Sequence, residues 1–265
     1  MMMYNVRGKP MSYRFFVNPH QVNWQEKKAS ISDQEQTHKI SRVLRLREND
    51  QIVLLDGTGL VYNAQIVSFF SRAIQCRLLS RRSTNTDPEL KITIAQSMLK
   101  GPKFDYVLQK CTEIGVSEFI PVTAERTVVR VDEEVSRDAD RRINRYEKIV
   151  QDAAEQSERG FVPVIKNLMT IDELCKTNLA AYDLKLVCAE RSQTNGIKEV
   201  LNSIQSKVQK VLLLIGPEGG FTENELKQAL SSGFTSVSLG KRIYRSETVG
   251  MLLSGILFFY FNDLR

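Results

Sequence analysis

Five short apolar runs separated by helical patterns constrain the fold of residues 90–265 more than any other feature. They lie at 91–96, 118–123, 184–189, 211–216 and 235–240. Near-continuous apolar runs of this length are typical of parallel strands buried on both faces. A helix is predicted at 103–114, with Pro102 in its first turn and Gly115 at its end, and a long polar helix near 137–157. The alternation predicts an α/β layer architecture.

The first part of the chain has a different pattern. Short β-like runs occur at 13–17, 51–56, 60–69 and 73–79, with a hairpin signal in "DGTG" and one helix near 33–45. This favours a small β-barrel with a helix. The polar stretch 80–90, which contains Pro88, predicts a linker between a domain at 11–82 and a domain at 90–265. Residues 1–10 are interpreted as an extension before Met11.

The positive charge is concentrated in the first domain. The net charge is +6, and residues 11–82 carry eleven Lys and Arg against six Asp and Glu. A local positive excess favours a polyanionic partner, although an ordinary solvated surface is the alternative.

Several classes of protein are disfavoured. The longest nearly apolar run, 249–261, is too short to span a bilayer, and no secretory signal is visible. Four cysteines without a C-x-x-C pair, and only two histidines, disfavour a metal site. Unpaired cysteines of this kind indicate a reducing, cytoplasmic location.

The stretch "IGPEGGFTENEL" at 215–226 predicts a strand end, a tight turn and a helix start. Thr222 and Glu225 have the spacing of a capping box, and Phe221 and Leu226 that of a hydrophobic staple. Ligands of open α/β sheets bind beyond the carboxyl ends of strands. The turn lacks the Lys-Ser/Thr pair of a Walker loop and the G-x-G-x-x-G spacing. Glu218 would repel a phosphate, so the turn favours a neutral or partly cationic ligand.

A second strand, at 235–240, leads through a polar loop into an apolar C-terminal helix. The loop contains Lys241, Arg242, Arg245 and Glu247. Ser246 or Thr248 is expected to cap the helix. Its predicted buried face consists of Val249, Leu252, Leu253, Ile256, Leu257 and Tyr260.

Taken together, "IGPEGGFTENEL" and "LGKRIYRSETV" resemble the paired C-terminal motifs of the SPOUT RNA methyltransferases. The similarity is greatest to the bacterial 16S rRNA (uracil(1498)-N(3))-methyltransferases. It extends over nearly the whole chain after Met11 and includes the segments 38–59, 100–130 and 152–163. The sequence departs from the family pattern at Tyr244, where an aliphatic residue is usual, and at Val249, where Ala is common.

The resemblance implies a parallel-sheet catalytic domain ending in a trefoil knot, preceded by a PUA-like RNA-binding barrel. It implies a homodimer that uses S-adenosylmethionine to methylate N3 of a specific uridine of 16S rRNA in the small ribosomal subunit. A sulfonium cofactor without phosphate makes Glu218 tolerable in the turn. The residues implied to line the cofactor site are Glu190, Ile215, Gly216, Pro217, Glu218, Gly219, Gly220, Leu239, Gly240, Arg242, Ile243 and Tyr244.

Methylation at N3 requires loss of the N3 proton and stabilisation of charge on the flanking carbonyl oxygens. A cation aimed at such an oxygen would stabilise it. Arg245 is the first candidate and Arg159 in "EQSER" the second. Glu247 is a candidate proton acceptor; its alternative role is that of a carboxylate favoured by the helix dipole.

The candidate RNA-binding residues are chosen by charge and hydrogen-bonding type. They are His38, Arg42, Arg45, Arg126 and Gln156. Arg42 and Arg45 are expected one helical turn apart, where they would contact phosphates, which position an RNA without specifying its sequence. The alternative is a helix with a solvated basic face, and a structural hydrogen-bonding role is favoured for His38.

Two other functions are weighed against this one. A ribose 2′-O-methyltransferase could share the fold, but the similarity over the full chain and the N-terminal barrel disfavour it. A non-catalytic RNA-binding assembly factor is disfavoured by the intact glycine turn and the "RSET" segment.

Overall fold

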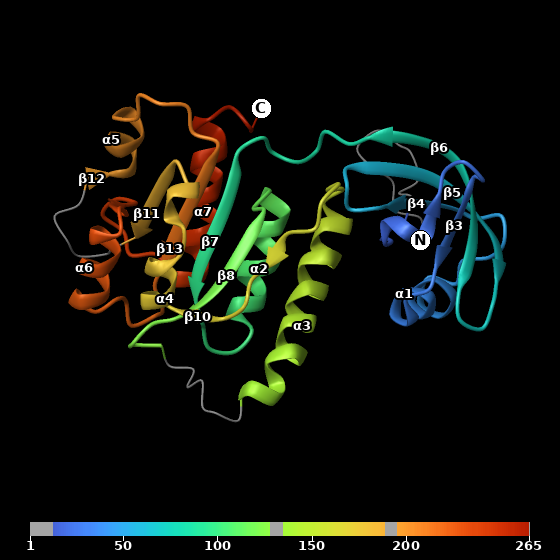
Figure 1. Cartoon of the computed structure of the whole chain (residues 1–265), viewed down its shortest axis with the longest axis horizontal. Helices are drawn as coiled ribbons and strands as arrows, with labels where there is room; N and C mark the ends of the chain where they lie inside the picture. Colours follow the sequence, from blue (N-terminus) through green and yellow to red (C-terminus); the bar gives the residue numbers. More distant parts are fainter. Residues whose placement is uncertain (1–12, 128–134, 189–194, 265) are drawn as a thin grey trace. The chain divides into compact units, whose positions relative to one another are not determined.

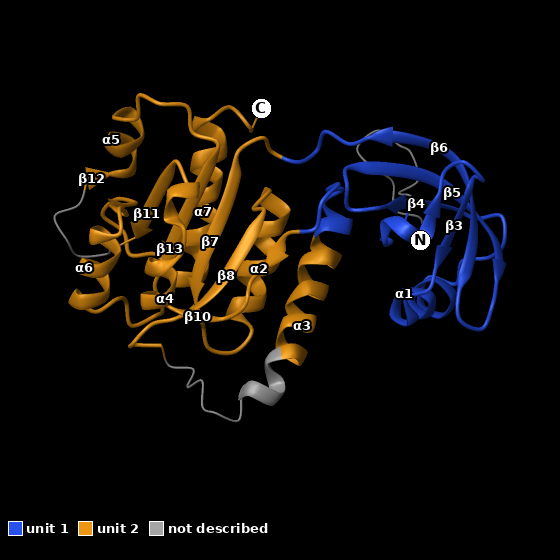
Figure 2. Cartoon of the chain, viewed as in Figure 1, with its two compact units in different colours: residues 1–87, 154–162 blue, residues 88–153, 163–265 orange. Residues whose placement is uncertain are grey.

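The computed structural model describes residues 13–127, 135–188 and 195–264. The chain forms two compact units (Figures 1 and 2). Unit 1 comprises residues 1–87 and 154–162, and unit 2 comprises residues 88–153 and 163–265. The segment 154–162 therefore belongs to unit 1, although it follows more than sixty residues of unit 2 in the chain. The domain boundaries 11–82 and 90–265 stay a prediction.

Unit 1 is built on a six-stranded sheet. Its strands lie in the order β1 (Arg14–Phe16), β4 (Gln51–Leu55), β5 (Leu60–Phe69), β6 (Ile74–Ser83), β3 (Lys28–Ile31) and β2 (Val22–Asn23). β1 runs parallel to β4, and the other neighbouring pairs are antiparallel. The inward-facing residues of the sheet, among them Phe15, Leu54 and Ile66, form one core. The four strands expected in this part of the chain are confirmed, whereas β2 and β3 were not predicted.

The hairpin between β4 and β5 turns at the predicted "DGTG". Gly57 and Gly59 have φ values of +74° and +88°, a conformation that favours glycine. The Asp56 carboxylate accepts hydrogen bonds from the backbone and hydroxyl of Thr58, which closes the turn.

The helix predicted near 33–45 is shorter and irregular. α1 (Gln34–His38) continues as a π-helical segment over Lys39–Val43. Arg45 then has φ of +53°, outside the helix. The prediction that Arg42 and Arg45 lie one helical turn apart is therefore wrong, because the chain turns between them to enter β4.

Unit 2 is built on a parallel sheet. The strands lie in the order β10 (Met169–Thr170), β8 (Glu118–Thr123), β7 (Lys91–Ser97), β13 (Lys210–Ile215), β11 (Leu184–Cys188), β14 (Thr235–Ser238) and β12 (Asn195–Gly196), and β9 (Val164–Ile165) also pairs with β8. All of these pairs are parallel. The five strands predicted from apolar runs are confirmed within two residues at each end, and the two-residue edge strands were missed.

Helices cover both faces of this sheet. Alternate residues of the central strands, such as Ala95 and Leu214, share a core with α4 (Ile171–Lys176) and α6 (Glu223–Ser231). Their neighbours point to the other face, where α2 (Lys103–Ile114) packs with α7 (Ser246–Tyr260). α3 (Val135–Gln156) packs on α2 through Tyr146, whose ring centroid lies 4.9 Å from that of Phe104. Neither α4 nor the remaining helix, α5 (Ile197–Asn202), was predicted.

The buried face of α7 differs from the predicted one. Its buried residues are Ser246, Val249, Gly250, Leu253, Ser254, Leu257 and Phe258. Tyr260 is exposed, and its hydroxyl donates to the Leu201 carbonyl at 3.0 Å. The face is rotated because small residues allow a close approach: a Cβ on Gly250 would lie 3.2 Å from Ile215 Cδ1.

Within the three described ranges, no helix combines the length and the apolar character that crossing a membrane requires.

Candidate functional site

The glycine turn at 216–220 joins β13 to α6. The capping box is confirmed: Thr222 Oγ1 accepts from the backbone N–H of Glu225, and the Glu225 carboxylate accepts from the backbone N–H of Thr222 at 2.8 Å. Phe221 and Leu226 both pack against the core beneath α6, as a hydrophobic staple does. Gly220 has φ of +67°. These contacts give the turn one defined shape.

Arg126, which follows β8, lies against this turn. Its guanidinium donates to the carbonyl oxygens of Gly219 and Phe221 at 3.3 and 3.5 Å. A Cβ on Gly219 would lie 3.1 Å from the Cβ of Arg126, so glycine permits this approach. Arg126 was predicted to bind RNA, and the structure brings it to the turn predicted to bind the cofactor.

The second loop, residues 239–245, follows β14. Gly240 has φ of +105° and is exposed. Arg242 donates to the Tyr244 hydroxyl at 3.1 Å, and Ile243 is 70% exposed although it is apolar. Leu239, Gly240, Arg242, Ile243 and Tyr244 line a cavity of about 70 Å³ that also includes Cys188. Burial raises the pKa of the Cys188 thiol to about 12, so this side chain is neutral at physiological pH.

Ser246, the first residue of α7, joins the two loops. Its hydroxyl donates to the Gly216 carbonyl and accepts a hydrogen bond from Gln96 Nε2 at 3.0 Å. Arg245 is the residue before the helix, and no side chain caps this end. The expectation that Ser246 or Thr248 caps α7 is therefore wrong, because the Ser246 hydroxyl forms hydrogen bonds with Gly216 and Gln96 instead.

A lysine from α2 completes the charges around the turn. Lys103 Nζ donates to Glu218 Oε1 at 2.8 Å and lies 4.0 Å from Glu247 Oε2. Burial opposes ionisation of Glu218, but the hydrogen bonds from Lys103 and from backbone N–H groups outweigh it and lower the pKa of Glu218. The hydrogen bond to Glu218 likewise raises the pKa of Lys103. Glu218 is thus a paired carboxylate, and its repulsion of an anion is weaker than its sequence position suggests.

A larger cavity lies beside Lys103. It measures about 680 Å³ and is lined by Pro102, Lys103, Asp105, Tyr106, Gln109, Ile149, Arg245, Glu247 and Thr248. Among the described residues, Glu247 Oε2 is buried without a hydrogen-bond partner. Two predicted catalytic residues, Arg245 and Glu247, therefore share one cavity.

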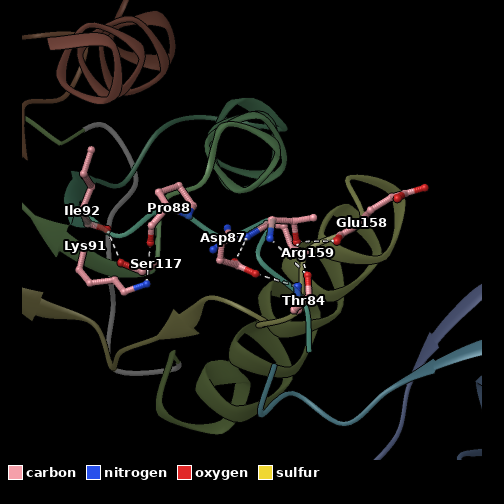
Figure 3. Close-up of polar contacts among 10 residues, drawn as sticks. Thr84, Asp87, Pro88, Lys91, Ile92, Ser117, Glu158 and Arg159 are labelled. Carbon is pink, nitrogen blue, oxygen red and sulfur yellow. Dashed lines mark hydrogen bonds and ion pairs between the residues drawn. The ribbon is translucent and has the colours of Figure 1, made fainter. Parts of the chain in front are cut away.

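Arg159 lies in unit 1 and is buried (Figure 3). Its Nε donates to Asp87 Oδ1 at 2.7 Å, and the backbone N–H of Gly160 donates to Asp87 Oδ2 at the same distance. The two side chains are only 5% and 7% exposed. This ion pair joins the end of the first segment of unit 1 to its 154–162 segment.

Four of the five predicted RNA-binding residues also lie in unit 1, and Arg126 lies in unit 2. His38, Arg42, Arg45 and Gln156 are all exposed. Gln156 is the last residue of α3. Glu190, the remaining predicted cofactor residue, lies outside the described residues. Across the part of the chain that the structure describes, no group of three or more His, Cys, Asp or Glu side chains is placed to hold a metal ion.

Comparison with known proteins decides the family. The RNA methyltransferase domain family matches residues 86–257, which is more than half of the chain, and the RNA methyltransferase PUA domain family matches residues 31–78. The chain belongs to the RNA methyltransferase domain family. The predicted fold class is also confirmed, with a PUA-like sheet unit followed by a parallel-sheet methyltransferase unit.

Individual members of this family are similar over most of the chain. The ribosomal RNA small subunit methyltransferase E of Synechocystis is 34% identical over 90% of this chain and 74% of its own length. That of Bacillus subtilis is 30% identical over 89% and 91%. The crystal structure of the Neisseria gonorrhoeae protein of the same name, bound to S-adenosyl methionine, is 30% identical, covers 94% of this chain and 98% of its own, and has a TM-score of 0.81.

Lys103, Tyr106 and Gln109 line the larger cavity but were not predicted as site residues from the sequence. They recur every third residue along α2, opposite the apolar stripe that predicted the helix. A polar helix face normally indicates residues that are exposed to solvent. The sequence near these three residues therefore does not distinguish them from ordinary surface residues.

Proposed function

We propose that this chain is an S-adenosylmethionine-dependent methyltransferase that modifies N3 of a specific uridine of 16S rRNA in the small ribosomal subunit. Its relatives are named as ribosomal RNA small subunit methyltransferases, and one solved relative binds S-adenosyl methionine. The observation that carries the proposal is the hydrogen bond from Ser246 to the Gly216 carbonyl. It holds the start of α7, with Arg245 and Glu247, next to the glycine turn.

The two loops suit a nucleoside cofactor that carries a sulfonium. Glycines 216, 219, 220 and 240 leave backbone groups open to close approach, and Gly220 and Gly240 have positive φ. The paired carboxylate of Glu218 and the neutral thiol of Cys188 are compatible with a cationic ligand without phosphate. The residues assigned to hold it are Ile215, Gly216, Pro217, Glu218, Gly219, Gly220, Leu239, Gly240, Arg242, Ile243 and Tyr244, together with Glu190.

We expect the loop at 239–245 to change shape when the cofactor binds. Its cavity of about 70 Å³ is smaller than the roughly 300–1,000 Å³ of small-molecule sites, and the exposed Ile243 side chain offers an apolar group to cover a ligand. The cofactor supplies an activated methyl group when bound, and the protein supplies alignment and electrostatics.

The chemistry at uracil requires that the N3 proton leaves and that the negative charge on the carbonyl oxygens is stabilised. Glu247 accepts the proton, since its buried Oε2 has no hydrogen-bond donor among the described residues. Arg245, in the same cavity, stabilises the developing charge on an oxygen. Arg159, whose guanidinium is already bound by Asp87, is the second candidate for that role. The base must be unpaired or extruded to reach the site.

Unit 1 carries the RNA-binding role in this proposal. His38, Arg42, Arg45 and Gln156 are exposed there, and cationic groups bind phosphates without reading sequence. Arg126, held against the glycine turn, extends the RNA-binding set to unit 2. The enzyme acts as a cytoplasmic homodimer.

The test is nucleoside mass spectrometry. Protein and S-adenosylmethionine are incubated with small ribosomal subunits, or with naked 16S rRNA, from a strain that lacks the gene. The expected product is 3-methyluridine in the rRNA. A ribose-methylated nucleoside would instead identify a 2′-O-methyltransferase, and cofactor binding without any methylated product would contradict the assigned RNA.

A further inference from the structure

The cavity beside α2 is distinct in its lining from the loop cavity that follows β14. Both cavities use side chains of the segment 244–249. Arg245, Glu247 and Thr248 line the cavity beside α2. Tyr244 and Val249 line the loop cavity. The larger cavity has a volume of about 680 Å³, within the range of roughly 300–1,000 Å³ typical of small-molecule sites. It is large enough for a base with its ribose.

The charged groups of this cavity include both signs. Lys103 and Arg245 are donors only, whereas Glu247 is an acceptor when ionised. Glu247 Oε2 lies 4.0 Å from Lys103 Nζ, is buried, and accepts no hydrogen bond from the described residues, and the Glu247 side chain is only 13% exposed. The fourth charged side chain, Asp105, is bound by Arg145 at 2.7 Å. Glu247 Oε2 is therefore a carboxylate oxygen of this cavity lining whose hydrogen-bonding capacity no described residue uses.

This arrangement is complementary to the pairing edge of uracil. That edge presents two carbonyl acceptors with the N3–H donor between them. Lys103 and Arg245 can donate to the two carbonyl oxygens, and the Glu247 carboxylate can accept from N3–H. Cytosine presents an amino donor in place of one carbonyl, and its N3 has no hydrogen, so it would leave a cation and Glu247 unmatched.

The α2 side of the cavity offers a surface for the flat face of a base. Tyr106 is 43% exposed although it is aromatic, and it lines the cavity together with Gln109 one turn later. Stacking of an unpaired base on an aromatic ring is a common way of binding single-stranded RNA. The Gln109 amide carries donors and an acceptor, so it can bind a ribose hydroxyl or a base carbonyl.

We propose that this cavity is the binding pocket for the extruded target uracil, with Tyr106 as the stacking residue and with Lys103 and Gln109 as further substrate-binding residues. The inference rests on the proposed methyltransferase function and extends it to residues of α2. In the pocket the N3–H bond breaks and its proton passes to Glu247. The N3 electron pair forms the new bond to the methyl carbon as the carbon–sulfur bond of the donor breaks, which releases a neutral thioether.

The experiment compares variants on small ribosomal subunits that lack the modification. Tyr106→Ala and Gln109→Ala are each measured for single-turnover formation of 3-methyluridine, for KM and for S-adenosylmethionine affinity by calorimetry. Loss of one stacking contact is expected to lower kcat/KM by roughly 10- to 100-fold. Cofactor affinity is expected to stay within about twofold of the wild type, because neither side chain lines the loop cavity.

Two control variants separate the roles. Tyr106→Phe keeps the ring and is expected to retain activity within a few-fold. Leu230→Ala removes an exposed side chain from α6, outside the cavity, and is expected to change nothing. Thermal melting checks that each variant is folded.

Four outcomes decide the proposal. Loss of methylation with retained cofactor binding, rescued by Tyr106→Phe, supports it. Wild-type rates in both alanine variants would overturn the pocket while leaving the methyltransferase assignment intact. An altered sedimentation coefficient of Tyr106→Ala would show that the cavity is a subunit interface, which also overturns it. A wild-type protein that forms no 3-methyluridine would overturn the proposed function itself.

Discussion

Lys103 and Glu218, 115 positions apart in the chain, form a hydrogen-bonded ion pair of 2.8 Å. The pair connects the first turn of α2 with the glycine turn after β13. It changes the chemistry of that turn, since a carboxylate that would be repulsive to anions is neutralised by a lysine from another element.

This pair predicts a pH window for stability. The Glu218 pKa is lowered in the folded protein, so its contribution is present above about pH 4.3 and is lost as the pH falls through the folded pKa. The Lys103 pKa is raised, so its contribution is present below about pH 10.4 and is lost as the pH rises through the folded pKa. Lys103→Gln is expected to lower the melting temperature within this window, and the difference from wild type should vanish in acid.

Thermal melting between pH 3 and pH 8 checks this expectation. Lys207→Gln is the matched control, since Lys207 is an exposed lysine of the same unit. An equal difference between wild type and Lys103→Gln at pH 3 and pH 7 would contradict the role of Glu218.

Loss of Arg245 is expected to slow chemistry more than binding. Removal of one group that stabilises a developing oxyanion typically lowers the rate by about 10²–10³-fold. We expect Arg245→Ala to lower the single-turnover rate by that factor and to bind S-adenosylmethionine nearly as well as the wild type. Rapid-quench assays measure the first quantity and calorimetry the second; Arg245→Lys, which keeps the charge, should lose less. An unchanged single-turnover rate would remove Arg245 from the mechanism.

The buried pair of Asp87 and Arg159 is expected to be important for stability. Removing one partner of a buried ion pair typically costs about 3–5 kcal/mol. Asp87→Ala should therefore lower the free energy of unfolding of unit 1 by that amount, measured by urea denaturation followed by circular dichroism. The double variant Asp87→Leu/Arg159→Met should be more stable than Asp87→Ala alone. If Arg159 acts only in catalysis, Asp87→Ala would instead unfold at the wild-type urea concentration.

Gly240 is expected to control the cofactor loop. An alanine at φ of +105° is strained by about 1–3 kcal/mol, and no neighbouring atom lies within 4 Å of the added Cβ, so the loop can relax by changing shape. We expect Gly240→Ala to raise the dissociation constant of S-adenosylmethionine about tenfold without unfolding the protein. Gly255→Ala is the control: it lies inside α7 with open space around it and should stabilise by about 0.5–1 kcal/mol. Equal cofactor affinity in both variants would argue against a role of Gly240.

The basic residues of unit 1 are expected to determine the salt dependence of RNA binding. Each phosphate contact contributes about 0.7–0.9 to the slope of the logarithm of affinity against the logarithm of salt concentration. The double variant Arg42→Gln/Arg45→Gln should therefore make that slope less steep by the contribution of up to about two phosphate contacts. Filter binding to 16S rRNA at several salt concentrations measures the slope. Lys207→Gln serves as the control in unit 2. If the double variant and the wild type had the same slope of affinity against salt concentration, Arg42 and Arg45 would be solvated surface residues that do not contact RNA.

The sequence by itself determined the parts of this protein that depend on local rules. The extents of α2 and β8, the hairpin at Asp56–Gly59 and the capping box of Thr222 follow from periodicity, turn chemistry and helix-end chemistry among residues close in the chain. The order of the motifs also sufficed to identify the family. The two-residue strands, β3, α4 and α5 were not predicted because segments of two to six residues have too little periodicity to detect.

Only the tertiary structure decided which distant groups meet. Ser246 was expected to cap a helix, but it bonds Gly216 because the chain brings the start of α7 to the end of β13. Tyr260 was expected in the core, but small residues turn another face of α7 inward. The pairs of Lys103 with Glu218 and of Arg159 with Asp87 join segments more than seventy positions apart. Such contacts depend on the crossing of elements in space, which no local pattern encodes.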